Sequence, residues 1–327
     1  MPKYSAHAKV NLLLSVGAAE PAGTPRAGWH RILSWFACID LADGVSIERL
    51  ADGHSSRHEV SWAADAMRAE VVDWPLEKDL AVRAHRSLEA HVGRALPASI
   101  KVEKRIPTGA GLGGGSSDAA TVLAGLREVF ALDLSMDELR GIGAALGSDV
   151  AFFLDEASSH GAAAPAVVSG FGESVERTGG VRGPVILVIP PFKCATAAVY
   201  GAFDALLADE QREDDRRRML NDQKGPARQW VPREQLVRGR VERMLGSGVL
   251  ESSLMFNDLA KAAFRVEPRL GQLSTAISRI TRMDAHVTGS GSCLFLLPAA
   301  GKVEWVEERV RRVAGEAGAV VVRAGFA

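Results

Sequence analysis

Apolar residues recur along the chain with the periods of strands and of helices. Residues 5–16 are mostly apolar and predict a strand, which two polar side chains interrupt. Residues 99–106 alternate apolar and polar side chains, as half-buried strands do. Residues 119–130 carry apolar side chains at helical spacing. The chain therefore runs from a strand through residues 107–118 into a helix.

The same patterns extend over the rest of the chain. They predict strands at residues 32–39, 45–47, 184–190, 286–297 (with a glycine turn inside) and 319–322, and helices at 79–91, 135–147, 196–204, 270–280 and 303–313. A turn is expected at residues 40–44, between the second and third strands. Ser135 and Glu138 form a capping box, and Gly147 is a typical residue for the end of that helix.

Residues 107–120 read P-T-G-A-G-L-G-G-G-S-S-D-A-A and hold five glycines. Glycine reaches positive φ without steric cost and lets a ligand approach the backbone. A helix N-terminus after such a loop offers free N–H groups and the positive end of the helix dipole to a phosphate. We expect phosphate to approach the backbone at Gly114, at positive φ, and Ser116, Ser117 and Asp118 to start or cap the helix. A single glycine triplet would favour a flexible turn before a capped helix. Five glycines between a strand and a helix favour the phosphate site.

The loop is unlike two better-known glycine motifs, and three polar residues elsewhere can be interpreted in more than one way. No lysine follows the glycines, so the loop is not a Walker A loop, and it fits a dinucleotide-binding pattern only loosely. Lys9 and Asn11 share one face of the first strand, which by itself favours an edge strand with a solvated face. Asp149 precedes an apolar run, where by itself it could equally cap a helix.

Composition indicates a globular chain without a strong charge bias. Its 327 residues, 47% hydrophobic, suffice for two packed domains or one large one. The net charge of −1 predicts neither nucleic-acid nor anionic-membrane binding. Three widely spaced cysteines and no apolar N-terminal segment lead us to expect a cytoplasmic protein without disulfides or a signal peptide. The highly charged residues 208–243 predict a solvated helical insertion.

The glycine stretch resembles the phosphate-binding motif of the GHMP kinases. Residues 8–12, A-K-V-N-L, are similar to the first motif of that family, and residues 288–293, T-G-S-G-S-C, to its third. Residues 147–150, G-S-D-V, are similar to the segment that carries the catalytic base in relatives acting on a cytidine-diphosphate-linked polyol. The chain departs from those relatives at Trp29 (usually Tyr), Asp79 (Asn), Ala151 (Pro) and Phe171 (Arg).

The resemblance implies roles for particular residues. Asp149 would be the general base, with Lys9 beside it to stabilise charge on the transferred group, and Asn11 would orient the acceptor. His30 would hold the cytosine. Further substrate contacts are implied at Thr196, Gly289, Ser290 and Gly291, ATP contacts at Pro107, Gly109, Ala110, Gly111, Leu112, Gly113, Gly114, Gly115, Ser116 and Ser117, and a Mg²⁺ contact at Ser117.

The resemblance also implies an α+β fold in two domains around one cleft. A ribosomal-S5-like ATP-binding domain would comprise residues 1–178, and a ferredoxin-like domain residues 179–327. ATP, Mg²⁺ and the cytidine-linked polyol would be its ligands, in a monomer or homodimer without a nucleic-acid or membrane partner. Two alternatives stay open: a GHMP kinase of homoserine or mevalonate type, and a catalytically silent binding protein on the same fold.

Overall fold

The computed structural model describes residues 2–69, 74–156, 162–220 and 231–327. Within these ranges the first sheet contains seven strands, with β3, β4, β2, β1 and β8 in that order; β5 pairs with β2, and β6 pairs with β5. Their bounds are β1 Lys3–Ala19, β2 His30–Arg49, β3 Arg57–Trp62, β4 Ala98–Lys104, β5 Ala166–Gly170, β6 Ser174–Arg177 and β8 Phe256–Asn257. The helices that precede β5 are α1 Leu80–Val92, α2 Gly114–Val129, α3 Met136–Leu146 and α4 Val150–Phe153, with a 3-10 turn at Leu76–Lys78.

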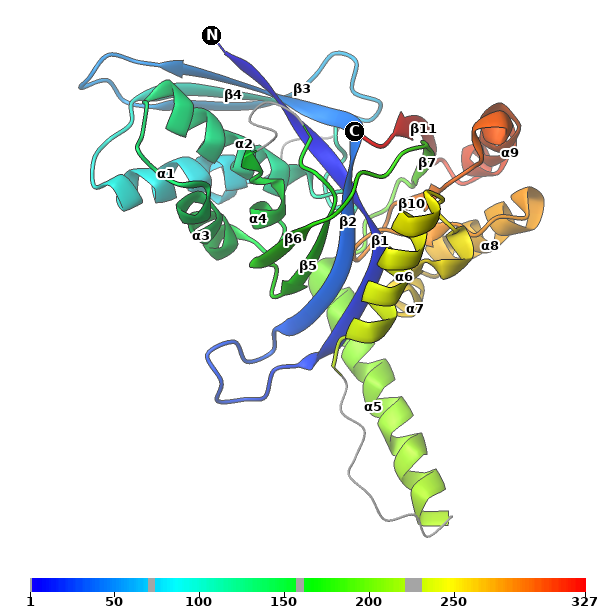
Figure 1. The fold of residues 1–327 in the computed structure, drawn as a ribbon. Coiled ribbons are helices and arrows are strands. Elements are labelled where there is room, and N and C mark those ends of the chain that lie inside the picture. Colours follow the sequence, from blue (N-terminus) through cyan, green and yellow to red (C-terminus); the bar gives the residue numbers. More distant parts are fainter. Residues whose placement is uncertain (1, 70–73, 157–161, 221–230) are drawn as a thin grey trace.

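The second sheet has the order β11-β7-β10-β9. Its strands are β7 Pro184–Ile189, β9 His286–Val287, β10 Leu294–Leu296 and β11 Val320–Gly325. The helices of this half are α5 Thr196–Leu220, α6 Glu234–Ser247, α7 Ala260–Val266, α8 Pro268–Thr281 and α9 Val303–Glu316, with 3-10 turns at Ser252–Leu254 and Ala300–Lys302. Figure 1 shows α1–α4 on one side of the long strands β1 and β2, and α7–α9 with the second sheet on the other.

Three large clusters of buried apolar side chains hold these layers together. One joins α1, α2 and α3 to β1, β2 and β4. A second packs α5 and α7–α9 on the four-stranded sheet. The third lies between the two sheets and includes Leu13 and Trp35 from the first and Leu187 and Phe295 from the second. The two halves therefore share a hydrophobic core, which packs them against each other.

One continuous strand, β2, replaces the two strands and the turn expected at residues 32–47. The register with β1 shifts between His7 and Ala8, whose partners are Ala42 and Ile39, so the turn-forming residues are accommodated as a bulge. Asp43, expected in an exposed turn, is buried and accepts backbone N–H groups from Arg105 and Ile106. These bonds replace the solvent contacts of a turn.

Strand β1 is also not the edge strand that its polar positions suggested by themselves. It lies between β2 and β8, and Lys9 and Asn11 are both 3% exposed. The other predicted helices and strands agree with the structure within a few residues, except that the helix expected at residues 196–204 continues to Leu220. The Ser135–Glu138 capping box is confirmed.

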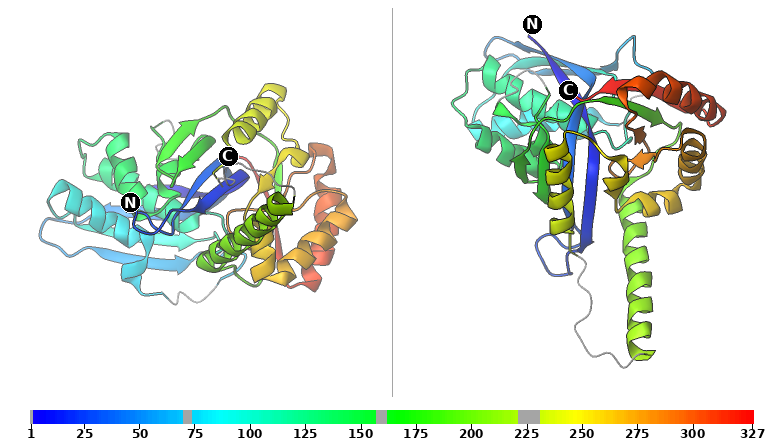
Figure 2. Two further views of the ribbon diagram at one scale, coloured as in Figure 1. Left: turned by 90° about the horizontal axis from the view of Figure 1, so that it is seen from below. Right: turned by 45° about the vertical axis from the view of Figure 1, so that its right-hand side comes forward.

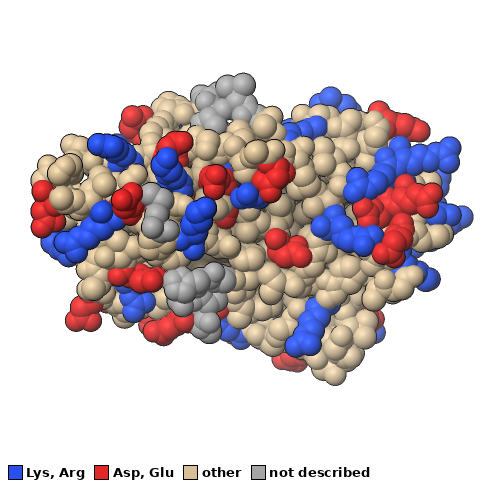
Figure 3. Space-filling model, turned by 90° about the horizontal axis from the view of Figure 1, so that it is seen from above, with Lys and Arg blue, Asp and Glu red and all other residues tan. Residues whose placement is uncertain are grey.

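The charged segment expected at residues 208–243 divides into unlike parts. Helix α5 continues to Leu220 and projects away from the body of the molecule (Figures 1 and 2). Residues 221–230 lie outside the described ranges. The α6 part is not simply solvated, because Val237, Val241 and Met244 are buried in the core between the sheets. On the face drawn in Figure 3, acidic and basic side chains are interspersed.

Candidate functional site

A cleft of about 740 Å³ opens between the two halves. Most residues predicted from the motifs line it together: Lys9, Asn11, His30, Gly109, Gly111, Gly113, Ser116, Asp149, Thr196, Gly289, Ser290 and Gly291. The others from the glycine stretch, namely Pro107, Ala110, Leu112, Gly114, Gly115 and Ser117, belong to the loop and helix start behind this lining. Segments separated by more than a hundred residues thus meet at one place.

An ion pair between a buried ammonium and a partly exposed carboxylate occupies the cleft. Lys9 Nζ lies 3.3 Å from Asp149 Oδ2, and the Asp149 side chain is 23% exposed. Asp149 precedes α4 but makes no side-chain cap bond, so its oxygens are not used to cap the start of the helix. Lys9 also lies 4.6 Å from the centre of the Phe36 ring, which keeps water from one side of the ammonium. The pair can therefore accept a proton and stabilise negative charge at the same point.

Asn11 fixes the position of Lys9. Its Oδ1 accepts from Lys9 Nζ at 2.6 Å and from the Thr288 hydroxyl at 3.2 Å. Its Nδ2 donates to Ser34 Oγ at 2.9 Å. Both lone pairs of the amide oxygen are therefore used within the protein. Asn11 thus orients Lys9 at least as much as it could orient a substrate hydroxyl.

The residues that carry positive φ in the glycine loop are Gly109, Gly111 and Gly113, at 68°, 78° and 73°. A Cβ at Gly111 would stand 2.2 Å from the carbonyl oxygen of Thr288, so the loop and the third motif touch through their backbones. Lys9 N donates to Leu112 O at 2.9 Å, which ties the same loop to β1. Glycine is required here because any side chain would separate these segments.

Gly114 differs from the expectation because it is already helical. Helix α2 begins at Gly114 with Gly113 as its N-cap, and no side chain caps it. The expected positive φ at Gly114 and the expected capping by residues 116–118 are therefore wrong. Ser116 faces the cleft, whereas Ser117 is 2% exposed.

Asp118 likewise has a different role from the helix-start role expected for it. It is buried and accepts a hydrogen bond from Lys104 Nζ at 2.5 Å. Burial raises its pKa, against the opposing effect of Lys104.

A tight turn behind the base constrains Asp149. Gly172, in the S-G-F-G-E segment, has a φ of 105°, and a Cβ there would lie 1.8 Å from the carbonyl oxygen of Ser148. Glu173 closes the same turn by accepting from the Phe171 N–H at 2.6 Å. The turn thus packs directly on the backbone that precedes the candidate base.

Aromatic side chains and a buried histidine line the other end of the cleft. His30 Nδ1 lies 2.9 Å from Gly17 O, which can only accept, so in the neutral ring Nε2 is the acceptor. That Nε2 lies 3.5 Å from Asp204, and the Tyr200 ring is 4.7 Å from the imidazole. Burial raises the pKa of Tyr200 to about 12, so it is a neutral phenol. Trp29 is 54% exposed at the mouth of the cleft.

Several contributors escaped the sequence analysis. In the sequence Thr288 is only the first residue of the third motif, and Tyr200 is one residue of the helix predicted at 196–204. Lys193 reaches the loop from the second half, with Nζ 2.6 Å from Thr108 Oγ1 and its stem against Gly109. No local pattern marks such residues, because their partners lie far away in the sequence.

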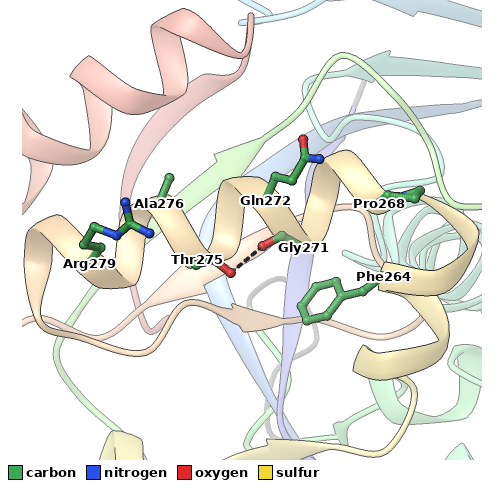
Figure 4. Close-up of a pocket in the computed structure, with 7 residues that line it drawn as sticks. All are labelled: Phe264, Pro268, Gly271, Gln272, Thr275, Ala276 and Arg279. Carbon is green, nitrogen blue, oxygen red and sulfur yellow. Dashed lines mark hydrogen bonds between the residues drawn. The ribbon is translucent and has the colours of Figure 1, made fainter.

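A second hollow, on the outer side of α8, has a different character (Figure 4). Phe264, Gly271, Thr275 and Arg279 are among its lining, and the Thr275 hydroxyl donates to Gly271 O at 2.8 Å. It lacks the base, the cation and the glycine loop of the main cleft. Within the described ranges, no helix is long and apolar enough to cross a membrane.

Residues 79–166 match the family model for the GHMP kinases N terminal domain. The 4-diphosphocytidyl-2-C-methyl-D-erythritol kinase of Mycolicibacterium gilvum is 33% identical over 298 residues, 90% of this chain and 81% of that protein. The enzyme of the same name from Polaromonas sp. is 37% identical over 197 residues, a match that spans 60% of each chain.

Solved structures agree with this similarity. A crystal structure of 4-(cytidine 5'-diphospho)-2C-methyl-D-erythritol kinase has a TM-score of 0.68 at 27% identity and covers 99% of both chains. Leishmania major mevalonate kinase in complex with R-mevalonate has a TM-score of 0.61 at 14% identity, covering 100% of this chain and 96% of that one, which shows the fold alone. The α+β GHMP kinase fold expected from the motifs is thereby confirmed.

Proposed function

The chain belongs to the 4-diphosphocytidyl-2-C-methyl-D-erythritol kinase family of GHMP kinases, and we propose that it transfers the γ-phosphoryl group of ATP to the 2-hydroxyl of that substrate. The observation that carries the proposal is the Lys9–Asp149 pair beside the glycine loop, in a cleft with an aromatic far end. The reaction would supply a precursor in non-mevalonate isoprenoid synthesis. The enzyme would act in the cytoplasm as a monomer or homodimer.

The transfer follows from the positions of the cleft residues. Asp149 accepts the proton of the acceptor hydroxyl as its oxygen forms a bond to the γ-phosphorus and the bond from that phosphorus to the β–γ bridging oxygen breaks. The buried Lys9 ammonium stabilises charge on the transferred group. Asn11 and Thr288 hold Lys9 in place, so little reorganisation accompanies the reaction.

The glycine loop and the N-terminus of α2 provide for the ATP phosphates. Free N–H groups at a helix start bind anions, and the positive-φ glycines let the phosphates approach the backbone. A Mg²⁺ ion would neutralise phosphate charge. The oxygens in the cleft, such as those of Ser116 and Asp149, suit Mg²⁺, because this ion is usually bound by hydroxyl and carboxylate oxygens together with phosphates and water. Since Ser117 is buried, we assign the contacting hydroxyl to Ser116 in place of Ser117.

The far end of the cleft suits a cytosine. His30 Nε2, held as an acceptor by the contact of Nδ1 with Gly17, can accept from the exocyclic amine of the base. Trp29 and Tyr200 offer aromatic faces for stacking. In this proposal the ATP-binding domain is residues 1–178, which contribute the glycine loop, the base and His30, and the second domain is residues 179–327, which contribute Thr196 and the third motif.

Purified protein with ATP and a panel of acceptors tests the proposal. We expect ADP release with 4-diphosphocytidyl-2-C-methyl-D-erythritol and a rate at least about 10²-fold lower with mevalonate or homoserine, since a site built for a base leaves polar groups unpaired without one. Turnover only with mevalonate or homoserine would select the other GHMP activities. ATP binding without turnover of any acceptor would select a silent binding protein.

A further inference from the structure

Three charged side chains form a buried cluster behind the glycine loop. Asp43 comes from β2, Lys104 from the end of β4 and Asp118 from α2, and they are 1%, 4% and 3% exposed. Lys104 Nζ donates to Asp118 Oδ2 at 2.5 Å and also to Asp43 Oδ2. None of the three lines the cleft, so they do not belong to the substrate contacts already described.

The cluster joins the two ends of the glycine loop. Asp43 Oδ1 accepts the N–H groups of Arg105 and Ile106, the last two residues before the loop. Lys104 connects this carboxylate to Asp118, which follows the loop on the second turn of α2. The chain entering the loop and the helix leaving it are therefore fixed to the same ammonium group.

The cluster also lies directly against the helix start. A Cβ at Gly114 would be 2.9 Å from Ile106 Cγ2 and 3.4 Å from Lys104 Nζ. Only a residue without a side chain lets the first turn of α2 rest on the residue that Asp43 holds. A shift of Lys104 would thus displace the N–H groups that face the phosphates.

Stability alone gives little reason for such a cluster. Desolvation of buried charges often cancels their attraction, and apolar replacements of similar volume can be as stable. One oxygen, Asp118 Oδ1, has no hydrogen-bond partner within the described residues, which adds to the cost. The cluster is therefore better explained by the two segments that it fixes, the chain before the glycine loop and the start of α2.

We propose that Lys104, bridging Asp43 and Asp118, is a positioning residue for ATP: it keeps both ends of the glycine loop in the phosphate-binding arrangement. The proposal rests on the proposed kinase function for the identity of the nucleotide but not for that of the acceptor. It predicts a loss of nucleotide affinity with little change in the rate of transfer once ATP is bound.

Two variants and one control test this. Lys104→Met removes the bridge but leaves two buried carboxylates, and it is expected to lose stability. Lys104→Met/Asp118→Asn removes one of those carboxylates and leaves Asp43 with its two backbone donors. Ile277→Ala, in α8, makes a cavity in the core of the other half and controls for lost stability. Each protein is measured by thermal unfolding, by calorimetric titration with a non-hydrolysable ATP analogue, and by steady-state kinetics.

We expect the double variant to regain stability relative to Lys104→Met. It should bind the analogue about tenfold more weakly than the parent protein, the loss of about one charge-assisted hydrogen bond. The KM for ATP should rise by the same factor while kcat stays within about threefold, and Ile277→Ala should keep its affinity. Analogue affinity within twofold of the parent in a folded double variant would overturn the proposal. Equal affinity loss in Ile277→Ala would do so too, as would failure of both Lys104 variants to fold, since the cluster would then serve stability.

The outcome is separable from the proposed function. Should the parent protein bind the ATP analogue but fail to phosphorylate the cytidine substrate, the acceptor assignment falls while the calorimetric comparison still decides the role of Lys104.

Discussion

Gly111→Ala tests whether the glycine loop and the third motif work as one unit. The φ of 78° at this position costs a non-glycine residue about 1–2 kcal/mol. The added Cβ would lie 2.2 Å from the Thr288 carbonyl oxygen, so the two backbones must separate by about 1 Å or more to reach an ordinary contact. Thr288 also bonds Asn11, which holds Lys9, so the displacement reaches the Lys9–Asp149 pair.

A misplacement of about 1 Å can cost about 10²-fold in rate, and we expect kcat of Gly111→Ala to fall by about that factor. The assay is steady-state ADP release with saturating ATP and cytidine substrate, beside thermal unfolding. Gly141→Ala is the matched control, because Gly141 lies inside α3 with nothing within 4 Å of an added Cβ. That control should gain about 0.5–1 kcal/mol of stability and keep its rate. A Gly111→Ala enzyme with kcat within twofold of the parent would show that the close approach is not needed.

Three further predictions follow from the site and from one histidine pair. Asp149→Asn should lower kcat by at least about 10²-fold in a folded protein, as loss of a general base does; near-normal turnover would remove the assignment. His30→Ala should raise KM for the cytidine substrate about threefold to tenfold, the loss of about one neutral hydrogen bond, with KM for ATP unchanged; a rise for ATP alone would place His30 at the wrong end of the cleft. Burial lowers the pKa of His58 and of His85, which lie 2.9 Å apart, below the usual 6.5. Below pH 6.5 the unfolded chain therefore binds more protons than the folded protein does. The two histidines contribute stability above pH 6.5, and this contribution is lost as the pH falls from 6.5 towards their lowered pKa values in the folded protein. Thermal unfolding between about pH 7.5 and 5 should show a falling midpoint, less steep in His85→Gln, and equal slopes would exclude the pair as the cause.

Local patterns predicted most elements because their causes are local. The helical spacing of apolar residues in 268–281 and the capping box at Ser135 need no distant partner. Residues 40–44 were mispredicted for the opposite reason: D-L-A-D-G has turn composition, but pairing with β1 and β4 and the buried bonds of Asp43 outweigh that local preference.

The candidate site divides in the same way. Motifs identified groups that line the cleft, such as Asp149 and the positive-φ glycines, because particular chemistry requires particular residue types at short spacing. They did not show which residues hold those groups in place. Thr288 positions Asn11, which lies 277 residues earlier in the chain. Gly172, in the turn between β5 and β6, packs on Ser148, which precedes α4.

Asp118 shows why a sequence-based assignment fails even inside a strong motif. At the start of a helix an acidic side chain usually interacts with free N–H groups, and this is the local optimum. Here Gly113 is the N-cap of α2 and lines the cleft, and no side chain caps the start of the helix. The carboxylate turns instead to Lys104, fourteen residues earlier in the chain. A capping carboxylate would compete with phosphate for the same donors, so withdrawing Asp118 into the buried cluster leaves the helix start free to bind an anion.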